Sequence, residues 1–175
     1  MNRFADYFSN YVNDDTITYI GNGDITSFTV SRQDRELAVG LNLESFIDYG
    51  IIENSQNQIA RAMELKKVHI NPRFPKSEFS LDNIERILEY VRHESPAANG
   101  FFDGCEAELE DRTLTLCLKK GGKDVLESQK VDRAIANKIY ELFDLDFVVI
   151  FLEVQAFDIE KAVQKAVEER RAEEQ

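Results

Sequence analysis

The carboxylates best placed for chemistry in this chain are Asp158 and Glu160, in the sequence Phe157-Asp158-Ile159-Glu160. An acidic pair two residues apart, close behind an apolar strand, is typical of nucleases that hold two metal ions with carboxylates. Here the pair falls beyond the expected strand, and no further carboxylates follow in a suitable arrangement. Acidic residues also stabilise the first turn of a helix. We therefore interpret the pair as a helix start and predict no catalytic residue.

The histidines and cysteines do not form a metal-binding or nucleophilic pattern. His69 falls on one face of an expected strand and His93 near an expected helix end, and neither has a partner at ligand spacing. Cys105 and Cys117 lack the second Cys or His pair that a zinc site needs. Two cysteines are also too few for a disulfide scaffold, which favours a reducing cytoplasm. We predict no metal and no cofactor.

The sequence Gly121-Gly122-Lys123 resembles part of a phosphate-binding loop. A complete loop needs a glycine four residues further upstream and Ser or Thr after the lysine, where this chain has Asp124. We interpret these residues as a helix start, and no small-molecule ligand is evident.

The charge of the chain argues against nucleic acid as the main partner. The net charge is −12: residues 1–75 hold 7 Lys+Arg and 10 Asp+Glu, and residues 76–175 hold 14 and 23. Polyanion binding requires clustered cations that displace counterions. Arg61, Lys66 and Lys67 are the nearest approach to such a cluster, and they define a nucleic-acid-binding alternative. No stretch approaches the roughly 20 apolar residues of a membrane span, and the acidic N-terminus does not resemble a signal peptide. We expect a cytoplasmic protein without membrane contact.

Hydrophobic periodicity predicts an α+β fold made of two small α/β-sandwich-like modules. In residues 1–72 it predicts the order αβββαβ, with helices over 4–12 and 48–63 and strands over 16–20, 25–30, 37–43 and 66–70. The segment Asn71–Pro75 is expected to end the first module, since neither proline can donate a backbone hydrogen bond.

Residues 78–155 are expected to form a second module of order ααββαβ. Ser80 is a candidate cap for a helix through Val91, and a short helix opened by Pro96 would carry Phe101 and Phe102. A hairpin over 106–119, one long helix over 123–143 and a buried strand over 147–152 complete the module. Residues 156–175 are predicted to form a charged helical linker to further domains.

Three aromatic residues near loops are candidate partner contacts: Phe74, Phe101 and Phe102. Exposed aromatic side chains are enriched in interaction sites. The competing interpretation is that they pack in the core.

Two stretches carry a resemblance to a known family. Residues 25–30, 37–43 and 68–70 resemble the first N-terminal domain of the PolC-type DNA polymerase III alpha subunit of Gram-positive bacteria, and residues 80–154 resemble the domain that follows. The second module is also similar to the C-terminal domain of the clamp-loader tau subunit and to the N-terminal domain of the initiator DnaA. In outline it is KH-like, although it has no G-x-x-G loop between two helices.

The resemblance implies a bacterial DNA-directed DNA polymerase, a nucleotidyltransferase with 3′–5′ exonuclease activity. None of the family's catalytic aspartates carries over, because the polymerase and exonuclease motifs are absent from these residues. The resemblance therefore implies a non-catalytic N-terminal region that docks to replisome proteins during DNA replication, such as clamp-loader tau or primosome components. The alternative is a nucleic-acid-binding module that positions template DNA.

Overall fold

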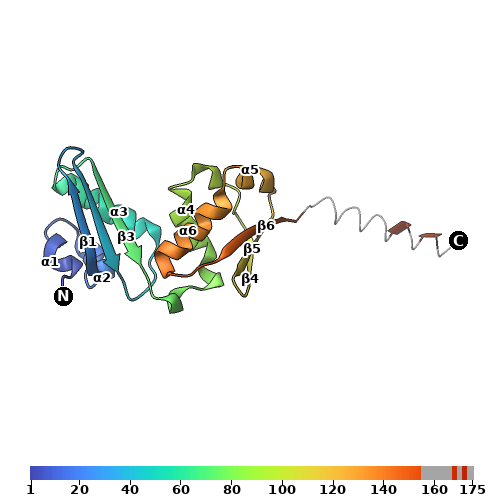
Figure 1. The fold of residues 1–175 in the computed structure, drawn as a ribbon, viewed down its shortest axis with the longest axis horizontal. Coiled ribbons are helices and arrows are strands. Elements are labelled where there is room, and N and C mark those ends of the chain that lie inside the picture. The colour runs from blue at the N-terminus through green and yellow to red at the C-terminus, as the bar shows by residue number, and fades with distance from the viewer. Residues whose placement is uncertain (155–166, 169–170, 173–175) are drawn as a thin grey trace.

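The computed structural model describes residues 1–154, 167–168 and 171–172, and it confirms the predicted α+β class. Two three-stranded sheets follow one another along the chain, and helices lie against each of them (Figure 1). The linker predicted over 156–175 lies outside the described residues apart from the four named above.

The first unit is built around the sheet β1-β2-β3. Strand β1 is antiparallel to β2, and β3 is parallel to β2. The parallel pair is joined by a helix, as a βαβ crossover requires. The elements are α1 (Phe4–Phe8), α2 (Asp14–Ile20), β1 (Asp24–Ser31), β2 (Glu36–Asn42), α3 (Tyr49–Ala62) and β3 (Lys67–Arg73).

The strand predicted over 16–20 is wrong, since these residues lie in helix α2. The Asn13 side chain accepts a hydrogen bond from the backbone N–H of Thr16, and Asp14 and Asp15 occupy the first turn. The cap and the two acidic residues of the first turn both stabilise a helix. Together they outweigh the preference of the β-branched residues in 16–20 for a strand. The first unit therefore has the order ααββαβ.

The predicted end of the strand at Ile70 is also wrong, because β3 continues through Pro72 to Arg73. The backbone N–H of Ile70 bonds the Gln56 side chain instead of β2. Successive residues of a strand direct their backbone groups to opposite edges. Pro72 therefore faces the same free edge as Ile70, where its missing donor costs no sheet hydrogen bond.

The second unit repeats the strand order of the first. In the sheet β4-β5-β6, β4 is antiparallel to β5, and β6 is parallel to β5. The strands are β4 (Glu106–Glu110), β5 (Thr113–Leu118) and β6 (Val148–Glu153). The helices are α4 (Ile84–Arg92), α5 (Lys123–Ser128) and α6 (Val131–Phe143), with 3₁₀ turns at Lys76–Glu78, Leu81–Asn83 and Pro96–Ala98.

The single long helix predicted over 123–143 is two helices. Lys130 has a left-handed backbone (φ 56°) between α5 and α6. Leu126 and Val131 are both buried but stand five residues apart, which a continuous helix would place on different faces. The break lets both side chains reach the core.

An aromatic cluster joins the two units. It consists of Phe46, Phe74, Phe79, Tyr90 and Phe143, with ring centroids 5.0 Å apart for Phe46 and Phe74 and 5.7 Å apart for Phe74 and Phe143. The Tyr90 hydroxyl donates to the Ile47 carbonyl (2.7 Å), and the Phe74 N–H donates to the Leu142 carbonyl (2.6 Å). The buried side chains form one cluster that extends through both units, not two separate cores.

None of the helices in the described part of the chain is both long enough and apolar enough to cross a membrane.

Candidate functional site

Two of the three predicted partner contacts are buried. Phe74 is 3% exposed within the aromatic cluster, and Phe102 is fully buried with its ring 6.0 Å from that of Phe151. The competing interpretation, packing in the core, is therefore confirmed for Phe74 and Phe102, because both rings fill space between packed elements. Phe101 is partly buried, and its ring lies against Gly122.

The exposed apolar residues of the second unit lie instead on β6. The strand predicted to be buried is buried on one face only, through Val149 and Phe151. On the other face Val148, Ile150 and Leu152 are 61%, 42% and 48% exposed. Among the described residues, helices pack on one face of this sheet and none covers the other, which leaves these side chains exposed.

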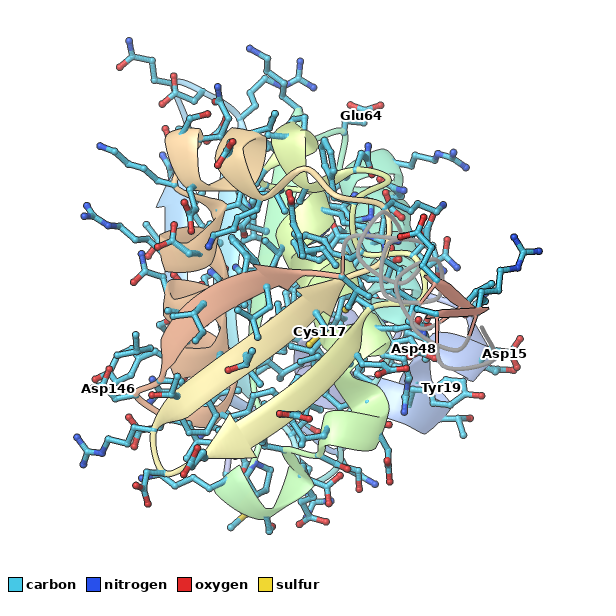
Figure 2. All side chains as sticks on the ribbon, turned by 90° about the vertical axis from the view of Figure 1, so that its right-hand side faces the viewer. Asp15, Tyr19, Asp48, Glu64, Cys117 and Asp146 are labelled. Carbon is cyan, nitrogen blue, oxygen red and sulfur yellow. The ribbon has the colours of Figure 1, made fainter. Side chains whose placement is uncertain are left out.

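We use the name open face for the side of this sheet on which none of the described helices packs. Register places Val148, Ile150 and Leu152 beside Thr113, Thr115 and Cys117 of β5. Glu110, Glu108 and Glu106 of β4 follow in the next row. Figure 2 shows the sheet of the second unit in front of its helices, with Cys117 and Asp146 labelled. The open face is thus aliphatic along β6 and acidic along β4, where Lys119 binds Glu106 (2.9 Å).

The outer edge of β6 has no neighbouring strand among the described residues. The N–H groups of Val148 and Val154 donate to Arg112 and Leu118, so these residues direct their backbone groups inward. Alternation directs those of Val149 and Phe151 outward. Residues 148–152 contain no lysine, arginine or proline, the residues that commonly protect a sheet edge.

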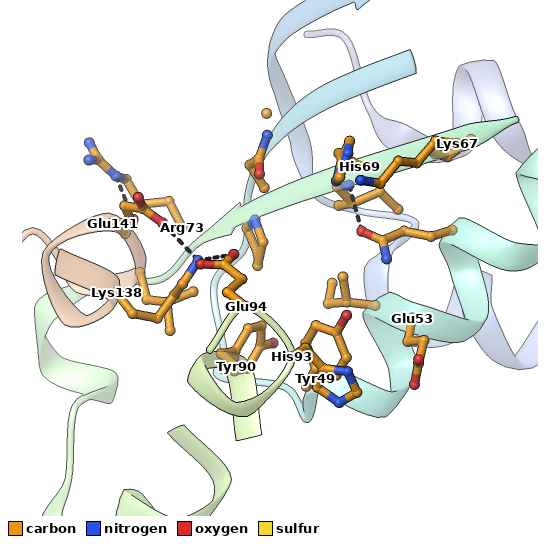
Figure 3. A pocket seen from close by; sticks show the side chains of 18 of the residues that line it. Tyr49, Glu53, Lys67, His69, Arg73, Tyr90, His93, Glu94, Lys138 and Glu141 are labelled. Atoms are coloured by element: carbon orange, nitrogen blue, oxygen red, sulfur yellow. Dashed lines mark hydrogen bonds and ion pairs between the residues drawn. The ribbon is translucent and has the colours of Figure 1, made fainter. Parts of the chain in front are cut away.

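A groove of about 1060 Å³ lies along β3, between α3 and the ends of α4 and α6. We call it the β3 groove. Figure 3 shows Lys67, His69 and Arg73 on β3, with His93, Glu94 and Lys138 contributed by the second unit. Lys66 and Lys67 of the predicted basic patch line this groove, whereas Arg61 is exposed on the last turn of α3 and does not.

Lys138 is the most enclosed cation of the groove. Its ammonium contacts Glu94 (2.6 Å) and Glu141 (2.8 Å). Burial lowers the pKa of Lys138, but hydrogen bonds to these two carboxylates outweigh burial and leave the pKa above its ordinary value. The Arg73 Nε donates to the Glu141 carbonyl oxygen (3.4 Å).

The structure brings the two histidines, which appeared isolated in the sequence, to the same groove. The His93 ring stacks on Tyr49 with centroids 3.9 Å apart. His69 shares a face of β3 with Lys67 and Asn71, because residues two apart in a strand point the same way. No local sequence signal indicates this arrangement, since β3 and α4 belong to different units.

The other candidate residues of the sequence are the two cysteines and the acidic pair Asp158 and Glu160. Among the described residues, no group of three His, Cys, Asp or Glu side chains could hold a metal ion. Cys105 and Cys117 are free thiols, and burial raises the pKa of Cys105. Asp158 and Glu160 lie outside the described residues.

The segment Gly121-Gly122-Lys123 begins helix α5, as predicted. The backbone N–H of Lys123 donates to a carboxylate oxygen of Glu153 (2.7 Å). A carboxylate of the chain therefore occupies the donor that a phosphate would need.

No protein-family model, curated protein or solved structure matches this chain.

Proposed function

We propose that this chain is a non-catalytic docking region of a bacterial replicative DNA polymerase of the PolC type, and that it binds a replisome protein through the open face. The exposure of Val148, Ile150 and Leu152 on one side of β6 carries the proposal. The resemblance described above supports the polymerase assignment and a cytoplasmic setting.

The three aliphatic side chains offer a contact of useful strength. Burying a half-exposed Val, Ile or Leu is worth about 1 kcal/mol, half of what full burial provides. The row together therefore contributes about 3 kcal/mol, or roughly a hundredfold in Kd. The unprotected edge of β6 could add main-chain hydrogen bonds to an extended partner segment.

The acidic side of the open face favours a partner with basic residues beside its apolar contact. Glu108 and Glu110 are exposed in the row next to β5. Complementary charge improves the rate and specificity of association. Clamp-loader tau and primosome proteins are the partners that the resemblance suggests.

The test is calorimetric titration of the full chain with purified clamp-loader tau and primosome proteins. The triple variant Val148→Thr, Ile150→Thr, Leu152→Thr keeps strand-favouring residues while removing apolar surface. We expect it to weaken binding about a hundredfold. The matched control is Phe28→Thr, Val30→Thr, which alters exposed apolar residues of β1. Absence of a complex at micromolar concentration, or equal loss with the control, would refute the proposal.

Cys117 provides a second readout within the same face. It is partly exposed between Glu106 and Leu152 in the sheet. A partner on the open face should slow its alkylation, and unchanged alkylation in a saturated complex would place the partner elsewhere.

A further inference from the structure

Strand β3 presents a row of basic side chains in an otherwise acidic protein. Lys67, His69 and Arg73 alternate along the strand and share one face, and Lys66 lies at its start. Along the strand, His69 is about 6.6 Å from Lys67, and Arg73 is about 13 Å beyond His69. In the described part of the chain, neither lysine nor Arg73 forms an ion pair with a side chain.

The acidic residues of the β3 groove are mostly engaged by another cation. Glu94 and Glu141 both bind Lys138, which leaves Glu53 as the remaining acid of the lining. Lys138 balances one of these two charges, so the four Lys and Arg residues of the lining exceed its three glutamates by one positive charge, and the cations without an ion pair lie on the β3 side. A concave wall concentrates that field and attracts an anion despite the net charge of the chain.

The surface of β2 beside the middle of this row is formed by small and polar residues. Ala38 and Gly40 of β2 are the register partners of His69 and Asn71, so small residues lie beside the middle of the row. At its two ends the register partners are Glu36 for Lys67 and Asn42 for Arg73. A Cβ at Gly40 would meet the hydroxyl oxygens of Ser27 and Thr26 within 2.6 Å. The hydroxyl groups of Ser27 and Thr26 therefore fill the space above Gly40, and a ligand on this surface would meet polar side chains, with Asn71 as a further hydrogen-bonding group and His69 as a ring for stacking.

We propose that the β3 groove binds the sugar–phosphate backbone of a single-stranded nucleic acid. Lys66 and Lys67 at one end of β3 and Arg73 at the other, about 20 Å away, would contact phosphates several nucleotides apart, since cations along an extended strand suit a linear polyanion. A duplex is stiff over about 150 base pairs, which disfavours its entry between α3 and the second unit. This site lies on a different sheet from the open face and does not depend on the proposed function.

Fluorescence anisotropy with a labelled 12-nucleotide oligonucleotide and the full chain tests the proposal. Three phosphate contacts predict a slope of log K against log[salt] of about −2, so affinity should fall about twenty-fold between 20 and 80 mM salt. Lys67→Ala or Arg73→Ala should reduce that loss to about sevenfold, because each removes one contact. Lys67→Arg should restore the original slope.

The control variants are Arg61→Ala and Arg112→Ala, which change exposed cations outside the groove. They should leave the salt slope unchanged. The proposal is overturned if the oligonucleotide does not bind at 20 mM salt, or if the control variants lower the slope as much as the groove variants. Equal binding of a duplex, or equal competition by polyglutamate, would also overturn the assignment to single strands.

Discussion

Replacing Phe74 with alanine should both destabilise the protein and uncouple its two units. Phe74 is buried, and its ring contacts those of Phe46, Tyr90 and Phe143. Losing three aromatic pairs costs about 2 kcal/mol and losing the burial of the ring about 2 kcal/mol more. The total of about 4 kcal/mol lies within the range of about 3–5 kcal/mol for deleting a buried aromatic ring.

Urea unfolding followed by circular dichroism and tyrosine fluorescence measures this effect, since the chain has no tryptophan. With an m-value of about 2 kcal/mol/M, the midpoint should fall by about 2 M, and the two signals should cease to coincide. Tyr19→Ala, at an exposed ring, is the control and should change stability by less than about 0.5 kcal/mol. A loss below about 1 kcal/mol for Phe74→Ala, with coincident signals, would show that the aromatic cluster does not couple the units.

Three further predictions concern single groups. Burial, and then the nearby Asp48 and Tyr49, raise the pKa of Tyr90 in the folded protein. Above pH 10 the Tyr90 hydroxyl therefore ionises in the unfolded chain but not in the folded one, and the free energy of unfolding should fall by about 1.4 kcal/mol per pH unit. Tyr90→Phe should cost about 1–2 kcal/mol at pH 7, because it loses the hydrogen bond to the Ile47 carbonyl. In denaturant titrations its free energy of unfolding should fall less steeply above pH 10, and an identical fall would contradict this. Gly122→Ala should cost about 2–4 kcal/mol, because φ is +94° and the new Cβ would meet the Phe101 ring at 2.2 Å. The control Gly100→Ala adds backbone strain alone and should cost about 1 kcal/mol. Equal shifts of the melting temperature would refute the steric argument. Iodoacetamide at pH 8 should alkylate the partly exposed Cys117 before Cys105, because burial raises the pKa of the Cys105 thiol. Mass spectrometry measures the order, and the reverse order would contradict the burial of Cys105.

Local patterns predicted the elements whose determinants lie within a few residues. The alternation of Leu37, Val39 and Leu41 predicted β2, and the helical spacing of Ile52 and Ile59 predicted α3. The hairpin of β4 and β5 followed from its alternation and from a turn at Glu110-Asp111. The same local reasoning failed at α2, where a capping interaction by Asn13 competes with β-branched residues.

Of the candidate sites, the sequence indicated only Lys66 and Lys67 of the β3 groove. The sequence of β6 is apolar at every position from 147 to 152, so no alternation distinguishes Val149 and Phe151, which are buried, from Val148 and Ile150, which are not. Phe74 and Phe102 stand near loops in the sequence, yet contacts with distant elements bury them.

The sequence by itself determined the class of fold, most of the strands and helices and the acidic charge, because these depend on composition and on short-range periodicity. Only the tertiary structure decided which face of β6 meets solvent and which charged residues of separate elements share the β3 groove. The physical reason is that exposure depends on whether a second layer covers a strand, and that layer comes from residues far away in the chain.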